Sequence, residues 1–224
     1  NDASGGNTSI VFDDLQYYDT VRQLLDDFSG PYPGTSWTDA TPGTATNYND
    51  GAGHLVTVDQ STGPTSGTFK SDRTFKISDG ARLEFRIDLV GVDRSSVQDF
   101  VILGYIPNGI GDFATLTEYH LAFTAGQFYV GKAFGNWWET GYTSPVQPVP
   151  QSNVRLIQTF TGEGATVRVE SRLEDLSKGV NEAGRVFYQR MKVDNSGTIY
   201  LNKDGYFAIS MYRNAAPGNL AATW

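Results

Sequence analysis

Apolar and polar residues alternate one by one along residues 82–89, and this is the feature that most constrains the fold. Leu83, Phe85, Ile87 and Leu89 alternate with charged residues. Successive side chains of a β-strand point to opposite faces, so a strand here would have one apolar face and one charged face. Residues 166–173 repeat the pattern. Period-2 alternation of this kind predicts half-buried strands in antiparallel sheets.

Other segments extend the same interpretation. Residues 119–123 and 128–132 are strand-like and are joined by a short turn, which predicts a β-hairpin. Residues 199–201 and 207–211 flank a polar turn and predict a second hairpin. Residues 100–103 are continuously apolar, which is typical of a strand covered on both faces.

Gly, Pro, Asn and Asp cluster between these segments, which is where turns are expected. Many short strands separated by such turns favour an all-β, antiparallel β-sandwich of the jelly-roll type, with at most one or two short helices. Residues 19–28 are the exception, because Val21, Leu24, Leu25 and Phe28 follow a helical spacing. We leave this segment open between a short helix and a strand.

Length, cysteine content and net charge limit the class of protein to which this chain can belong. A chain of 224 residues is large enough to bury a substantial core as one domain. It contains no cysteine, which excludes a disulfide framework and a thiolate metal site. A formal net charge of −8 argues against nucleic-acid binding, which depends on Lys and Arg neutralising phosphates.

Composition favours an extracellular or cell-surface location. The chain has 25 Gly and loops rich in Ser, Thr and Asn, and it starts at Asn1 without an initiator Met, as after removal of a leader. No apolar run reaches the roughly 18 to 20 residues that a membrane-spanning helix needs. We therefore expect no membrane span in this sequence.

Residues 26–30 through Trp37, followed by the alternating strands, resemble the opening of laminin G-like and concanavalin A-like jelly-roll domains. The resemblance is one of pattern and covers about 200 residues. It implies a sandwich of the lectin and glucanase kind, with polysaccharide or another glycan as the expected partner. Fold analogy alone is a weak basis for function.

Such domains often end with a strand of apolar, aromatic and paired Asp residues that lies beside their first strand. Here that sequence pattern is found at residues 10–18, near the start. Residues 219–224 resemble the segment that leads into a closing strand. The sequence therefore divides into a closing-type strand at 1–20 and a jelly roll at 21–224. The early strand can belong to a preceding repeat, fold back as a permutation, or complete a neighbouring copy.

The third alternative is donor-strand complementation. An identical strand from the next subunit would satisfy the open backbone groups of an incomplete sheet, and head-to-tail repetition would build a filament. The apolar residues expected to be donated are Ile10, Phe12, Leu15 and Tyr17.

The best candidate for ligand binding is the run at residues 134–142. Sugar rings have apolar faces that stack on aromatic side chains, and Trp137, Trp138 and Tyr142 offer such surfaces. Neighbouring residues of a strand point to opposite faces, so we expect one of the two tryptophans to meet the ligand. Asn136 and His120 could orient hydroxyl groups.

Catalytic motifs are not found. Glycosidases of this fold class place carboxylates in a tight Glu-x-Asp-x-x-Glu arrangement, which the sequence lacks. The nearest pairs are Glu84 with Asp88 and Glu170 with Glu174, which solvated strand faces explain. There is no HExxH motif, and no Ser lies in a Gly-x-Ser-x-Gly elbow.

Calcium is the only metal that the sequence suggests, and no cofactor is certain. Asn47, Asn49 and Asp50 supply hard oxygen ligands in one loop, although their spacing does not match an EF-hand. Turn chemistry explains the same residues.

Three functions follow from these observations. The first is a non-catalytic surface or matrix protein with a carbohydrate-binding or adhesion module. The second is a structural subunit that polymerises by donating its N-terminal strand. The third is a glycoside hydrolase or polysaccharide lyase with a dispersed active site. The sequence favours a binding protein over an enzyme.

Overall fold

The computed structural model describes residues 37–41, 45–49, 55–59, 65–94, 100–107, 119–124, 127–132, 137–142, 152–195, 201–213 and 220–223. Side chains are described for residues 37–38, 70–90, 103–106, 153–195 and 201–209. Every regular element in these ranges is a β-strand. They contain no helix that is long and apolar enough to cross a membrane.

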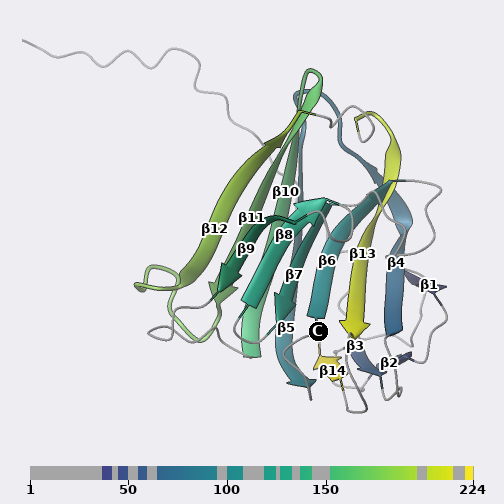
Figure 1. The fold of residues 1–224 in the computed structure, drawn as a ribbon, viewed down its shortest axis with the longest axis vertical. Coiled ribbons are helices and arrows are strands. Elements are labelled where there is room, and N and C mark those ends of the chain that lie inside the picture. Colours follow the sequence, from purple (N-terminus) through teal and green to yellow (C-terminus); the bar gives the residue numbers. More distant parts are fainter. Residues whose placement is uncertain are drawn as a thin grey trace, which may run out of the picture.

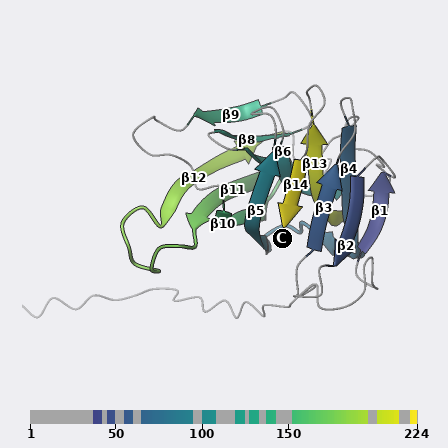
Figure 2. The same ribbon diagram turned by 90° about the horizontal axis from the view of Figure 1, so that it is seen from below.

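The strands form two seven-stranded antiparallel sheets, which Figures 1 and 2 show as two facing layers. The front sheet has the order β1 (Trp37–Thr41), β4 (Thr65–Lys76), β13 (Asp204–Arg213), β6 (Phe100–Pro107), β7 (Tyr119–Thr124), β8 (Gln127–Lys132), β9 (Trp137–Tyr142). The back sheet has the order β12 (Val186–Asp194), β11 (Thr166–Asp175), β10 (Ser152–Glu163), β5 (Arg82–Arg94), β14 (Leu220–Thr223), β3 (Leu55–Asp59), β2 (Ala45–Asn49). The predicted antiparallel β-sandwich is confirmed.

The residues that alternate between apolar and polar in the sequence alternate between buried and exposed in the sandwich. In β5, Phe85, Ile87 and Leu89 are buried, whereas Arg86 and Asp88 between them are exposed. Strand β11 repeats this, with buried and half-buried residues alternating from Thr166 to Leu173. Both predicted strands are therefore correct, and their apolar faces line the space between the sheets.

Aromatic rings join the two sheets at the centre of this space. Phe85 of β5 stacks on Phe207 of β13, with ring centroids 4.4 Å apart and planes 18° apart. Trp37 packs on Phe207 from β1 at 5.9 Å and is 3% exposed. Such contacts add about 0.5–1.5 kcal/mol beyond the burial of area.

One predicted hairpin is confirmed and the other is wrong. Strands β7 and β8 pair from Tyr119 with Lys132 to Thr124 with Gln127, as expected. The second prediction fails because β13 pairs with β4 and β6. Leu201 instead forms a parallel bridge with Ile77, since the chain crosses from the back sheet to the front sheet here. Alternation identified the strand but could not identify its partner.

The last described strand fills the interior of the back sheet. β14 pairs with β3 on one side and with β5 on the other. The segment that the sequence presents as an approach to a closing strand is itself a strand of this sheet. The segments at 1–20 and 19–28, and with them the proposed division at residue 20, lie outside the described residues.

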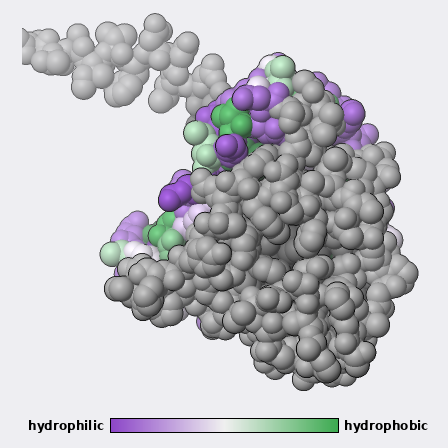
Figure 3. Space-filling view, viewed as in Figure 1, coloured by the Kyte–Doolittle hydropathy of each residue, from purple (hydrophilic) through white to green (hydrophobic). Residues whose placement is uncertain are grey.

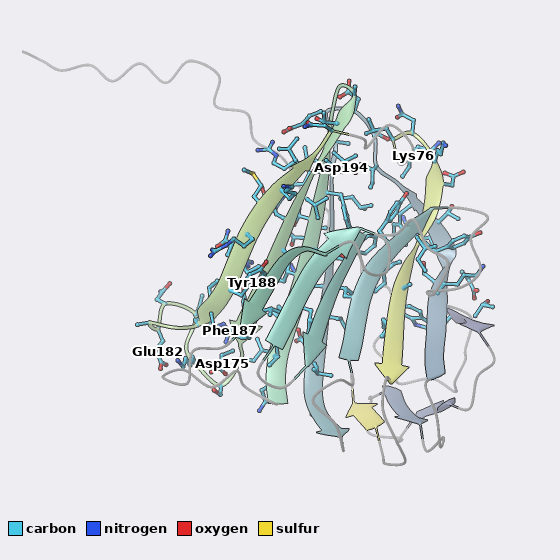
Figure 4. All side chains as sticks on the ribbon, in the orientation of Figure 1. Lys76, Asp175, Glu182, Phe187, Tyr188 and Asp194 are labelled. Atoms are coloured by element: carbon cyan, nitrogen blue, oxygen red, sulfur yellow. The ribbon has the colours of Figure 1, made fainter. Side chains whose placement is uncertain are left out.

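The loop between β11 and β12 is held by Arg185. Its guanidinium Nη1 donates hydrogen bonds to the carbonyl oxygens of Asp175 and Lys178, at 3.0 and 2.6 Å. The Asp175 carboxylate accepts hydrogen bonds from the backbone N–H and the hydroxyl of Ser177. Figure 4 shows Asp175 and Glu182 together at this end of the sheet. The loop therefore fixes where β12 begins.

A close approach of two strands requires glycine at position 205. The hydroxyl of Tyr105 lies 3.2 Å from the Phe75 carbonyl oxygen and 3.1 Å from that of Lys203, and burial raises the pKa of this tyrosine to about 12. A Cβ on Gly205 would overlap the Tyr105 ring and would lie 2.8 Å from the Ile106 carbonyl oxygen.

Gly205→Ala should therefore destabilise the protein by about 2–3 kcal/mol, because the core must shift to admit the methyl group. The free energy of unfolding, measured by urea denaturation, checks this. Gly179→Ala is the matched control, since its Cβ would have no neighbour nearer than 3.8 Å. Equal losses in the two variants would contradict the steric explanation.

Candidate functional site

Strand register brings two of the predicted ligand-binding residues into one row of the front sheet. Gly131 of β8 pairs with His120 of β7 on one side and with Trp137 of β9 on the other. Directly paired residues of antiparallel strands share a face of the sheet. His120 and Trp137 therefore occupy the same face, two strands apart, although they are 17 residues apart in the sequence.

This row continues across the sheet and lies on its outer face. His120 pairs with Gly104 of β6, and Gly104 pairs with Ala208 of β13. Neighbouring positions of Gly104, such as Leu103, belong to the core between the sheets. Residues that alternate along a strand with core residues point to the opposite face of the sheet. His120 thus has a glycine beside it on both sides, and farther along the row Gly104 and Ala208 are buried, although neither belongs to the core cluster between the sheets.

A β-bulge in β9 decides which aromatic residues share this face. Trp137 pairs with Gly131 and Glu139 pairs with Val130, so Trp138 is the extra residue between them. Tyr142, paired with Gln127, falls on the same face as Trp137 because of this extra residue. Without the bulge, positions 137 and 142 would lie on opposite faces. We call this outer-face set of His120, Trp137 and Tyr142 the aromatic row.

The register supports the choice of Trp137 as the tryptophan of the row. Side chains of β7 and β9 lie outside the described residues, so the ligand-binding roles of His120, Trp137, Trp138 and Tyr142 stay predictions. Asn136 lies wholly outside the described residues. Residues Ile10, Phe12, Leu15 and Tyr17 of the proposed donor strand do so too.

The candidate calcium ligands lie at an edge of the back sheet. Asn47 and Asn49 belong to β2, where they pair with Thr57 and Leu55 of β3. Their side chains and all of Asp50 lie outside the described residues. In the part of the chain whose side chains are described, no three acidic or histidine residues converge as a metal would require. The calcium prediction stays untested.

The carboxylates nearest to a catalytic pattern lie on the outer face of the back sheet, in ion pairs. Glu84 contacts Arg86 at 2.5 Å and Arg82 at 2.8 Å, and it accepts a hydrogen bond from the Thr159 hydroxyl. Partial burial acts to raise the pKa of Glu84, but the hydrogen bonds and positive charges hold it below its ordinary value. A general acid needs the opposite change.

Two further carboxylates are fixed by arginines. Arg155 donates two hydrogen bonds to Asp88, at 2.6 and 2.7 Å, and these raise the pKa of the guanidinium. Glu174 lies 3.0 Å from Arg172 and 3.5 Å from Arg185. These contacts tie β5 to β10 and hold β11 to the loop before β12, so a structural role accounts for Glu84, Asp88 and Glu174.

Sequence analysis missed a polar pair in the interior. Gln158 of β10 and Ser171 of β11 are directly paired, each 1% exposed, on the faces that line the core. In the described part of the chain, neither amide atom of Gln158 nor the Ser171 hydroxyl has a hydrogen-bond partner. Buried polar groups are normally hydrogen-bonded, so this pair is an exception within the core. The signal available was a glutamine in the apolar stripe of Leu156 and Phe160.

Known proteins resemble this chain in structure and not in sequence. No family model and no curated protein match the sequence. The lectin from Bauhinia forficata in complex with GalNAc is similar with a TM-score of 0.60 and 10% identity, over 86% of this chain and 92% of that one.

Two further solved structures agree. Lectin I-B4 from Griffonia simplicifolia, in a metal-free form, gives a TM-score of 0.57 at 9% identity, over 86% of this chain and 93% of that one. The carbohydrate recognition domain of Emp46p, in a potassium-bound form, gives 0.52 at 12%, over 84% and 85%. At such identities the likeness establishes the fold alone. The chain has a concanavalin A-like lectin fold.

Glu84→Gln should lower stability at about pH 7 by roughly 0.5–1 kcal/mol, because it removes the charge from a part-buried ion-pair cluster. The pKa of Glu84 is lower in the folded state than its ordinary value of 4.5. Its contribution is therefore complete above about pH 4.5 and is lost as the pH falls through the folded pKa. The stability gap between wild type and variant should close towards about pH 3, measured by denaturant unfolding.

Glu170→Gln is the matched control. Glu170 of β11 and Glu84 of β5 both pair with Thr159 of β10, so they share the outer face of the back sheet, and Glu170 has no ion pair among the described residues. A gap for Glu84→Gln that stayed constant with pH would show that charge is not its cause.

Proposed function

We propose that this protein is a non-catalytic, extracellular or cell-surface module that binds a carbohydrate on the outer face of its front sheet. The observation that carries the proposal is the aromatic row, in which register aligns Trp137 with His120 across Gly131. The 25 Gly and the loops rich in Ser, Thr and Asn support the extracellular or cell-surface location. This argument does not depend on the binding site.

The row has the chemistry that a sugar requires. An indole can stack on the apolar face of a pyranose ring, while imidazole and phenol groups can hydrogen-bond its hydroxyls. Gly131, which lies between His120 and Trp137 in this row, places no side chain between them. Asn136, which precedes β9, would add an amide at the end of the same row.

Similar folds support the class of ligand. One of the similar structures is a lectin in complex with GalNAc, and another is a carbohydrate recognition domain. The carboxylates that come nearest to a catalytic pair lie on the back sheet and are paired with arginines, which argues against hydrolysis on that face. A glycoside hydrolase or lyase remains the alternative, and release of reducing sugar or unsaturated product would identify it.

Calcium is the cation to test in this proposal. Asn47, Asn49 and Asp50 would supply oxygen ligands at the end of β2, away from the row. The similar structures include a potassium-bound and a metal-free form, so binding should be measured both with calcium and after its removal by a chelator. A change in melting temperature on adding calcium would support a structural cation.

Trp137→Ala should weaken glycan binding about tenfold or more, because a stacked indole is a typical binding hot spot. A glycan array followed by titration calorimetry on the best ligand measures the change. Trp138→Ala is the matched control, and we expect a smaller loss because position 138 is the bulge residue outside the row. Binding to no glycan, or an unchanged affinity in Trp137→Ala, would refute the proposal.

A further inference from the structure

We propose that β12 is an acceptor edge, and that it pairs antiparallel with residues 10–18 of a neighbouring copy of the chain. The inference concerns self-association and does not depend on glycan binding. It also revises the donor-strand hypothesis, because the interior position between β3 and β5 is already filled by β14. A donated strand must therefore add to an edge.

Strand length separates β12 from the other edges. The described sheets end at β1, β9, β12 and β2. Strand β12 has 9 residues, whereas β1 and β2 have 5 each and β9 has 6. A free edge presents a row of backbone donors and acceptors, and a longer edge forms more hydrogen bonds with an added strand. The segment at 10–18 has the same number of residues as β12.

Charge also distinguishes β12 from the other edge strands. The donor segment contains Asp13 and Asp14 and no basic residue. Strand β1 carries Asp39 and β9 carries Glu139, while β2 has no charged residue. Strand β12 carries Arg190, Lys192 and Asp194, a balance of +1. In a chain of net charge −8, β12 is thus the edge that attracts an acidic strand.

The surface of β12 is also unusually apolar for an exposed edge. Met191 is 55% exposed, Val186 42% and Val193 38%, and Val180 in the preceding loop is 84% exposed. Figure 3 shows apolar patches interrupting the hydrophilic surface on this side of the molecule. Exposed hydrophobic residues along a long edge are what sheet proteins avoid unless a partner covers them.

One antiparallel register matches two pairs of apolar residues and sets one acidic residue opposite one basic residue. Pairing Phe12 with Met191 also places Ile10 opposite Val193, so that apolar residues meet on the outer face of the back sheet. The same register places Asp13 opposite Arg190 and Leu15 opposite Tyr188 on the other face. Shifting it by one residue would reverse the faces of the donor and separate these partners.

The neighbour is favoured over the same chain as the source of the donor. Strand β1, which begins at Trp37, and β12 lie at opposite ends of the sandwich in both views (Figures 1 and 2). Self-pairing would require residues 19–36 to run from the β1 end of the sandwich to the β12 end, and closing a loop of this length costs conformational entropy. Donation to a neighbour has no such requirement. Because donor and acceptor surfaces differ, the contact is heterologous and propagates head to tail.

Cysteine pairing tests the register directly, since the chain contains no cysteine of its own. Chains carrying Phe12→Cys and chains carrying Met191→Cys are mixed and mildly oxidised. We expect disulfide-linked dimers, with about tenfold less product when Asp13→Cys replaces Phe12→Cys, because position 13 faces the other way. Circular dichroism confirms that each variant is folded. Equal products from both mixtures would overturn the register.

Sedimentation of the intact chain tests the association itself. We expect oligomers that grow with concentration, that disappear on deletion of residues 1–18, and that weaken about tenfold in R190E/K192E. Adding D13K/D14K in the same chain should restore them, which loss of folding could not do. A monomer at every concentration, oligomers that survive the deletion, or a link between positions 12 and 191 within one chain would overturn the proposal.

Discussion

The contact between Phe85 and Phe207 is the interaction on which the rest of the sandwich depends. It joins the centre of the back sheet to the centre of the front sheet, with ring centroids 4.4 Å apart. Trp37 packs on the same ring and brings β1 to this centre. The two inner faces meet at this contact. Paired residues share a face, so the inner and outer faces of every other described strand follow from its register, counted from β5 in one sheet and from β13 in the other. The aromatic row is outward because Leu103 beside it is inward.

The two sheets use their outer faces differently. On the back sheet, arginines neutralise Glu84 and Asp88, and Arg155 and Thr159 join β10 to β5, so polar contacts help to hold the sheet together. On the front sheet, the row through His120 contains Gly104 and Gly131, and it is buried at Gly104 and at Ala208, which pairs with Gly104. The ligand is therefore sought at the end of the row formed by His120 and Trp137, and not at its buried part.

Much of the fold could be predicted from the sequence, because alternation and turn residues are local signals. Strands β5 and β11 and the hairpin of β7 and β8 follow from them. Partners across the sandwich could not be predicted, since Leu201 meets Ile77 through a crossover that no local pattern encodes. In the same way the composition of residues 134–142 indicated a binding segment, but only the bulge at Trp138 shows which aromatic positions share a face.

The position of β14 changes what the early closing-type strand can mean. A strand with partners on both sides completes a sheet, so the back sheet needs no donor to protect its interior. An added strand can then only lengthen the sheet at an edge, where binding is weaker and depends on side-chain complementarity. Charge and length give β12 that complementarity to residues 10–18. Association at β12 would therefore be reversible and sensitive to salt, unlike the folding of the sandwich itself.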